Sequence, residues 1–207
     1  QLNSIEAADW ATLSSDQIRA ISTKAIAGLD ATRISNLTSD QVQSLATEQV
    51  KALTSTALHD LTSSQVLALT TEQVSTLSAS QVAGIDSADL VQMSTEQIVA
   101  ISTAAVLGLT FAQVNQLTTD QIEALTTDQI AKLTTDQIVA LSSTQAPKLS
   151  AQQITALSTA QVSKLGVDNL KVLSYDAIEA LSVSQAKVLS STQVGALTSS
   201  QFRHLST

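Results

Sequence analysis

The sequence lacks several residue types on which most globular proteins depend. It has no cysteine, one proline, one methionine and five glycines, and aromatic residues make up 2% of its 207 residues. Without cysteine, neither a disulfide framework nor a thiolate metal site can form. Without aromatic bulk, the core must be built from repeated aliphatic side chains. No run of about 18 apolar residues is present, so we expect no membrane insertion.

Basic residues are also scarce. The chain has 10 lysines and arginines against 18 aspartates and glutamates, which gives a formal net charge of -8. Proteins that bind phosphate backbones need clustered lysine and arginine, so we expect no nucleic-acid partner. The chain opens at Gln1 without a signal peptide, and Gln1 and Ser206 belong to incomplete repeats. We therefore expect the parent array to be longer than this chain, or its ends to be covered by another molecule.

The dominant feature of the sequence is a period of eight residues. A large aliphatic residue recurs every eight positions from Ile5 to Leu205, at 26 positions without insertion or deletion. We number this residue position 1 of each octad. A second apolar column stands at position 6, from Trp10 to Phe202, and the clearest copies read LTTDQIEA, LTTDQIAK and LTTDQIVA over residues 117–140. The repeat predicts a single continuous array of about 25 octads over residues 1–207.

The spacing of the two apolar columns selects the local structure. Steps of five and three average 4.0 residues, which is too long for one continuous α-helix at 3.6 residues per turn. The odd separation would also put the two columns on opposite faces of a strand. Position 2 is Ser, Thr or Asp in 23 of 26 octads, and position 5 is Gln in 17 of 25. Because Ser/Thr-x-x-Gln is a capping box, each octad is predicted to begin a new short helix.

Charge placement supports the same prediction. Ten of the 18 acidic residues stand at position 4, in the first turn, and eight of the ten basic residues stand at positions 7 and 8, in the last turn. This distribution complements a helix dipole that restarts in every octad. We interpret acids such as Asp120, Asp128 and Asp136 in this way, since one carboxylate per unit is too few for a calcium ladder. Pro147 is expected to disturb only the last turn of its helix.

Helices this short are unstable alone, so neighbouring octads must bury their aliphatic residues together. The predicted fold is all-α, a solenoid or superhelical rod of very short capped helices with one helix per octad. Lysines recur every 16 residues and acids every 24, so we leave the number of octads per turn between two and three. The expected core ladder in the clearest octads is Leu117, Ile122, Leu125, Ile130, Leu133, Ile138 and Leu141, and the expected capping pairs are Thr118 with Gln121, Thr126 with Gln129, and Thr134 with Gln137.

Departures from the repeat are the places to search for chemistry. His59 and His204 stand in variable outward columns and are expected to be solvated, so we expect no catalytic residue, no cofactor and no metal site. Trp10 and Phe202 are expected to fill the core. Phe111 and Tyr175 at position 3 are the candidates for lateral contacts between rods, and residues 166–170, which lack the cap hydroxyl and the glutamine, are expected to form a kink.

Octads such as LTTDQIEA, LTTDQIAK and LSTAQVSK resemble the low-complexity arrays of very large bacterial surface proteins, often labelled adhesin, haemagglutinin or haem-utilisation proteins. The resemblance covers essentially the whole chain. It implies an exported, extended stalk or fibre segment outside a bacterial cell, with copies of itself or flanking domains as partners. LTTEQVST at residues 69–76 also resembles the first helix of TAL effector repeats, but the long period and basic charge of that family are missing.

These observations favour a non-enzymatic structural repeat protein that acts as a spacer, stalk or self-assembling fibre segment. The alternative is a binding module that presents its regular Ser and Thr rows to a glycan, to ice or to a copy of itself. Ice binding would need a regular hydroxyl face. The variable residues that follow the cap, such as Ala31 and Val183, count against such a face.

Overall fold

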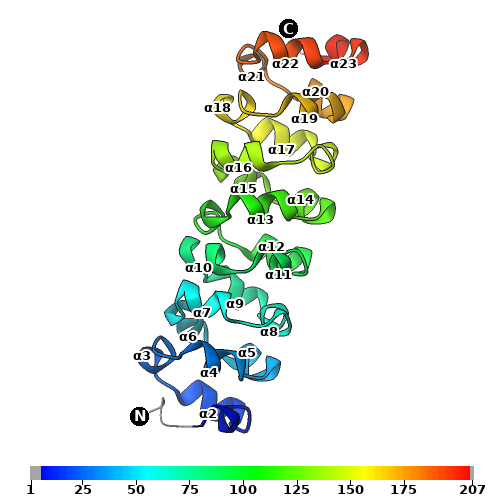
Figure 1. The fold of residues 1–207 in the computed structure, drawn as a ribbon. Coiled ribbons are helices and arrows are strands. Elements are labelled where there is room, and N and C mark those ends of the chain that lie inside the picture. The colour runs from blue at the N-terminus through cyan, green and yellow to red at the C-terminus, as the bar shows by residue number, and fades with distance from the viewer. Residues whose placement is uncertain (1–5, 206–207) are drawn as a thin grey trace. The chain divides into compact units, whose positions relative to one another are not determined.

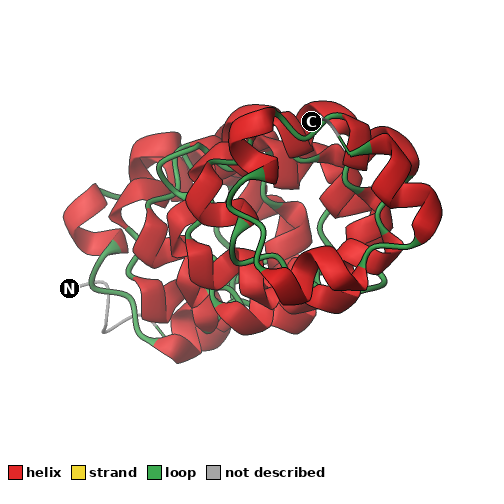
Figure 2. Cartoon of the chain, turned by 90° about the horizontal axis from the view of Figure 1, so that it is seen from above, coloured by secondary structure: helices red, strands yellow, loops and turns green. Residues whose placement is uncertain are grey.

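The computed structural model describes residues 6–205, and this part of the chain is all-helical without a strand. Short helices follow one another in every octad and are joined by short loops (Figure 2). The predicted fold, a solenoid of very short capped helices with one per octad, is therefore confirmed. The expectations that concern Gln1 and Ser206 lie outside the described residues.

Two compact units make up the chain, Gln1–Leu109 and Thr110–Thr207, and Figure 1 labels the helices of both. In the first unit the helices are α1 (Ala7–Trp10), α2 (Ser15–Ala20), α3 (Thr23–Ile26), α4 (Ala31–Ser35), α5 (Ser39–Ser44), α6 (Thr47–Ala52), α7 (Ser55–His59), α8 (Ser63–Ala68), α9 (Thr71–Ser75), α10 (Ala79–Gly84), α11 (Ser87–Leu90), α12 (Thr95–Ala100) and the 3₁₀-helix η2 (Val106–Gly108).

The second unit continues the same pattern. Its helices are α13 (Phe111–Gln116), α14 (Thr119–Ala124), α15 (Thr127–Lys132), α16 (Thr135–Ala140), the 3₁₀-helix η3 (Ala146–Lys148), α17 (Ala151–Ala156), α18 (Thr159–Val162), α19 (Val167–Val172), α20 (Tyr175–Glu179), α21 (Val183–Ala186), α22 (Ser191–Ala196) and α23 (Ser199–His204).

Each helix is short because the backbone leaves the helical region once per octad. Leu125, at position 1, ends α14 with φ -54° and ψ 134°, and its amide still donates to the Ile122 carbonyl. Thr126, at position 2, is extended with φ -70° and ψ 157° and caps α15. No described residue has a positive φ. The chain therefore turns between helices without the left-handed conformation that usually calls for glycine.

Within each unit, a helix packs on the third helix along the chain. Examples are α2 on α5, α5 on α8 and α9 on α12 in the first unit, and α17 on α20 and α20 on α23 in the second. Sequence periodicity had left two and three octads per turn open, and these contacts indicate about three. Neighbouring turns of the stack therefore bury one another's aliphatic side chains.

The two apolar columns form the core. Position 6 is fully or almost fully buried from Trp10 to Ile178, and the predicted ladder from Leu117 to Leu141 is at most 4% exposed at every residue. Phe202 departs from this pattern with 58% exposure. The expectation that it fills the core is wrong, because the octads that would cover it in the next turn lie beyond the described residues.

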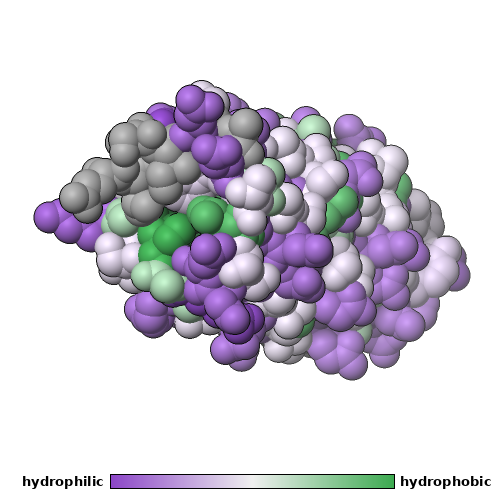
Figure 3. All heavy atoms as spheres, turned by 90° about the horizontal axis from the view of Figure 1, so that it is seen from below, coloured by the Kyte–Doolittle hydropathy of each residue, from purple (hydrophilic) through white to green (hydrophobic). Residues whose placement is uncertain are grey.

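The first octads show the same effect at the opposite end of the array. Leu13, Ile21 and Leu29 are half-buried at position 1, whereas Leu37 and later residues of this column are buried up to Leu181. Figure 3 shows an apolar area surrounded by hydrophilic side chains on the face seen from below. The ends of a stack of identical layers expose what its middle buries.

Two local expectations need correction. The octad with Pro147 contains no α-helix and ends in η3, so more than its last turn is affected. The octad of η2 takes the same form without proline, so the missing amide of proline is not the only cause. The expected kink at residues 166–170 is instead the start of a regular helix, α19, because Gly166 takes the extended N-cap conformation with φ -60°.

Candidate functional site

The capping box recurs in almost every octad of the structure. In α15 the Thr126 hydroxyl accepts a hydrogen bond from the Gln129 amide at 3.1 Å, and the Gln129 Oε1 accepts from the Thr126 amide at 2.9 Å. The pairs Thr118–Gln121 and Thr134–Gln137 have the same reciprocal bonds. Two of the four amides that a helix start leaves without partners are thereby satisfied.

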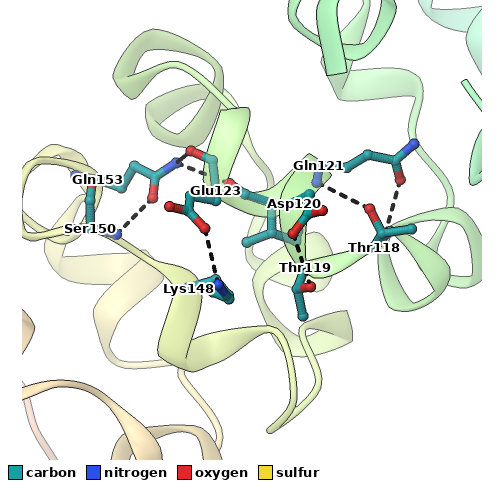
Figure 4. A network of polar contacts seen from close by, with 9 residues as sticks. Thr118, Thr119, Asp120, Gln121, Glu123, Lys148, Ser150 and Gln153 are labelled. Atoms are coloured by element: carbon teal, nitrogen blue, oxygen red, sulfur yellow. Dashed lines mark hydrogen bonds and ion pairs between the residues drawn. The ribbon is translucent and has the colours of Figure 1, made fainter. Parts of the chain in front are cut away.

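The same glutamine also bonds to the preceding turn of the stack. The Gln153 Nε2 donates to the Ile122 carbonyl at 3.0 Å and to the Leu125 carbonyl at 2.7 Å, while its Oε1 accepts from the Ser150 amide at 2.8 Å (Figure 4). Gln153 is 2% exposed. All of its hydrogen-bonding capacity on the amide nitrogen is used, so the buried amide carries no unpaired donor.

We call this arrangement the glutamine bridge: a position-5 glutamine that caps its own helix and donates to carbonyls 28 and 31 residues earlier. It recurs with the same spacing at Gln41, Gln49, Gln65, Gln73, Gln81, Gln145, Gln161, Gln185, Gln193 and Gln201. The acceptors lie at the C-terminal end of one helix and just before the cap of the next. One side chain therefore joins three helix ends.

The sequence interpretation assigned only the capping half of this role. A glutamate would complete a capping box equally well, and the helix dipole would favour its charge near the N-terminus. Position 5 nevertheless contains no glutamate in any octad. The consistent choice of Gln over Glu is the signal that an N–H donor is needed there.

Five later octads depart from the bridge. Ala57, Ala105 and Ala177 have no side-chain donor at position 5, Asp89 has a carboxylate, and Asn169 has a shorter amide. The Asn169 Nδ2 still donates to the Leu141 carbonyl at 2.8 Å, again 28 residues earlier. A side chain one methylene shorter than Gln thus reaches one of the two carbonyls.

A sequence profile described as the ALTTAQ repeat matches residues 10–47, 42–79, 82–119, 109–135 and 119–151, which together cover more than half of the chain. The chain belongs to the ALTTAQ repeat family. The six letters correspond to position 8 of one octad followed by positions 1 to 5 of the next, as in ALTTEQ at residues 68–73 and ALTTDQ at residues 124–129. No curated protein matches the chain.

In these ALTTAQ repeats, a second set of contacts joins residues 25 apart, between position 7 of one octad and position 8 of the third octad after it. The Asn115 Nδ2 donates to the Ala140 carbonyl at 2.9 Å, and the Lys148 Nζ lies 3.2 Å from the Glu123 Oε2 (Figure 4). Both members of the ion pair are about half exposed. Such surface pairs contribute little to stability, so the buried bridges determine how the turns pair.

Close helix contact is a third feature of the ALTTAQ stack in the first unit. A Cβ added to Gly84 would overlap the backbone carbonyl of Ser55, and one added to Gly108 would overlap that of Ala79. Both pairs are 29 residues apart and place α10 against α7, and η2 against α10. Glycine is needed at these two positions because backbone meets backbone.

The two aromatic residues predicted for lateral contacts lie on the surface. Phe111 is 56% exposed and Tyr175 is 52% exposed. The ring of Tyr175 stacks on His204 of its own chain with centroids 5.3 Å apart, and the His204 Nδ1 lies 3.4 Å from the Glu179 Oε2. One face of Tyr175 is thus engaged within its own unit. Their role in contacts between rods remains a prediction.

The second histidine also pairs with a carboxylate. The His59 Nδ1 lies 3.0 Å from an oxygen of Asp86, and both side chains are more than half exposed. They line a shallow groove of about 530 Å³ with Ser55, Thr56 and Ser80. The sequence analysis had weighed the adjacent Asp60 as a partner, whereas the stack supplies one 27 residues away.

Few other features of the described chain suggest chemistry. No group of three or more His, Cys, Asp or Glu side chains suited to a metal ion occurs among residues 6–205. Hydrogen bonds from its own backbone amide and from the Ser94 hydroxyl lower the pKa of Glu96, which is exposed near the start of α12. That carboxylate serves the helix start. The helices of the described part are all too short or too polar to cross a bilayer.

Proposed function

We propose that this chain is a non-enzymatic structural segment, which acts as an extracellular stalk, spacer or self-assembling fibre segment of a bacterial surface protein. The glutamine bridge is the observation that carries the proposal. The same three hydrogen bonds recur with the same spacing from Gln41 to Gln201. An array built in this way can be lengthened by identical increments, which is what a spacer requires.

The distribution of side chains supports a mechanical role over a catalytic one. Large aliphatic residues and bridge glutamines are buried throughout, while the exposed residues are mainly Ser, Thr and small or charged side chains that vary between octads. Enzymes concentrate perturbed titratable groups in a cleft, and we find no such constellation among the described residues. The proposed partners are copies of the chain or flanking domains of the same protein.

The test is to change the number of octads and to measure molecular length by small-angle X-ray scattering. Duplicating residues 117–140 adds three octads and preserves the bridge register, so the maximum dimension should rise by a fixed increment per duplication. Duplicating residues 117–144 adds 28 residues and breaks the register at the junction, which makes it the matched control. A maximum dimension that does not change with octad number would contradict the spacer role.

The proposed location has its own test. Antibodies raised against the chain should label intact cells of the source organism without permeabilisation, and electron microscopy of the purified chain should show thin rods or filaments. Labelling only after permeabilisation would contradict an extracellular location.

A further inference from the structure

Asp89 is a buried acid in the place of a bridge glutamine. It stands at position 5 of the octad that forms α11 and is 8% exposed. Asp9, the other acid at position 5, is exposed. The Asp89 carboxylate makes no hydrogen bond or ion pair with the described residues, although its amide donates to the Asp86 carbonyl at 3.0 Å. Burying an unpaired carboxylate is costly, so a partner outside the chain is expected.

Two carbonyl oxygens face this position without a side-chain donor. Gln81 donates to the Val50 and Leu53 carbonyls at 2.8 Å each. One octad later, the corresponding carbonyls belong to Leu58 and Leu61, which stand 31 and 28 residues before Asp89. No side chain of the described residues donates to either of them. The repeat therefore directs the Asp89 carboxylate toward two acceptors.

Asn169 shows how far a side chain of this length reaches. It differs from aspartate only in its amide nitrogen, it occupies the same octad position, and its Nδ2 lies 2.8 Å from the Leu141 carbonyl. Asp89 in the same conformation would place a carboxylate oxygen at a similar distance from the Leu61 carbonyl. Two acceptors at hydrogen-bond distance repel each other unless a donor or a positive charge lies between them.

We propose that Asp89, together with the carbonyl oxygens of Leu58 and Leu61, binds a calcium ion. Calcium prefers carboxylate and backbone carbonyl oxygens and completes its coordination with water. In this octad the ion takes the place of the amide NH₂ that joins the two carbonyls in neighbouring octads. Asp86 adds a second carboxylate at the start of α11, where it pairs with His59 and does not cap the helix.

The ligand set also indicates the strength of binding. A single buried carboxylate and two carbonyls carry one negative charge, so the site belongs with weak calcium sites, which have dissociation constants of about 10⁻⁴–10⁻³ M. The carbonyl pairs that face Ala57, Ala105 and Ala177 lack a carboxylate and have no reason to bind a cation. Within the described stack, the site is thus specific to Asp89.

The experiment compares thermal unfolding of the whole chain, followed by circular dichroism, in EDTA and in increasing CaCl₂ at constant ionic strength. The wild-type melting temperature should rise with calcium and saturate in the millimolar range, and isothermal titration calorimetry should give one site. Asp89→Asn and Asp89→Gln supply the missing donor, so both should fold, melt at or above the wild type in EDTA, and bind calcium at least tenfold more weakly.

The matched control is Asp128→Asn, which removes the same charge from an exposed position and should respond to calcium like the wild type. Calcium responses that are equal in the wild type and in both Asp89 variants would overturn the proposal. It would also be overturned by a wild-type chain that responds no more to CaCl₂ than to NaCl or KCl of equal ionic strength, since water or a monovalent ion would then occupy the space.

Discussion

At the scale of single residues, the stack depends on one side chain with two functions. The bridge glutamine accepts with its oxygen at the start of its own helix and donates with its nitrogen to the preceding turn. Each such bond contributes about 1 kcal/mol net, but an unpaired buried donor or acceptor costs about 1–3 kcal/mol. The effect of a substitution therefore depends on which of these groups it leaves unsatisfied.

Replacing Gln153 by glutamate separates the two functions. The carboxylate can still accept from the Ser150 amide, but it faces the Ile122 and Leu125 carbonyls without a donor. We expect Gln153→Glu to lower the free energy of unfolding at pH 7 by about 2–3 kcal/mol. Because the charged form is disfavoured, its folded-state pKa is raised. The loss should therefore shrink as the pH falls toward the ordinary glutamate pKa of about 4.3, where the protonated carboxyl can donate.

The control for this prediction is the neighbouring exposed residue. Gln152→Glu adds the same charge at position 4, where acids are common in this sequence, and the helix dipole favours it. Urea unfolding of both variants between pH 4 and 8 checks the prediction. Equal stability of the two variants at pH 7 would mean that the donated bonds contribute nothing.

Two glycines give a second contrast between residues. Gly84→Ala would drive a methyl group into the Ser55 carbonyl, and overpacking of this kind costs about 1–3 kcal/mol. Gly195 lies inside α22 with nothing within 4 Å of an added Cβ, so Gly195→Ala should add about 0.5–1 kcal/mol through helix propensity. Thermal unfolding of both variants should show shifts of opposite sign.

At the scale of the helix, the caps determine where each element begins. Thr126→Ala removes the hydroxyl that accepts from the Gln129 amide and should cost about 1 kcal/mol. Thr127→Ala alters the next residue, which is exposed inside α15, and should be neutral or slightly stabilising because alanine favours the helix. Denaturant unfolding of the two variants provides the measurement. A larger loss for Thr127→Ala would reverse the assignment of the cap.

Helix starts were predictable from the sequence because their determinants are local. The hydroxyl at position 2 and the glutamine at position 5 stand three residues apart, and both capping bonds form within one octad. The donation to the preceding turn was not predicted, because it joins residues 28 and 31 apart and requires the packing of the stack. The stacking of Tyr175 on His204 and the pairing of His59 with Asp86 were missed for the same reason.

At the scale of the whole molecule, stability is a sum over neighbouring turns. Leu125→Asp would bury a charge in a column that is 3% exposed at this residue, and a change of this kind costs about 4 kcal/mol or more. Val139→Asp places the same side chain at a residue that is 50% exposed and should change stability by about 0.5 kcal/mol or less. Equal melting temperatures of these two variants would mean that position 1 is not a core position.

Hydrogen exchange can show how far the damage from Leu125→Asp extends. The Gln153 Nε2 donates to the Leu125 carbonyl, so protection should fall around residue 125 and again around residue 153, with less effect on the octads between them. Uniform loss of protection across residues 117–157 would instead indicate that this part of the stack unfolds as one cooperative block.

The equal spacing of the bridges has a consequence for inheritance. Loss or gain of eight residues gives every later glutamine a new pair of acceptors, but the neighbouring octad presents the same carbonyls in the same places. Unequal recombination between near-identical copies in the gene would therefore produce longer and shorter alleles that still fold. Only idiosyncratic pairs such as Gly84 with Ser55 would lose their counterparts, so natural variants are expected to differ in length by multiples of eight codons.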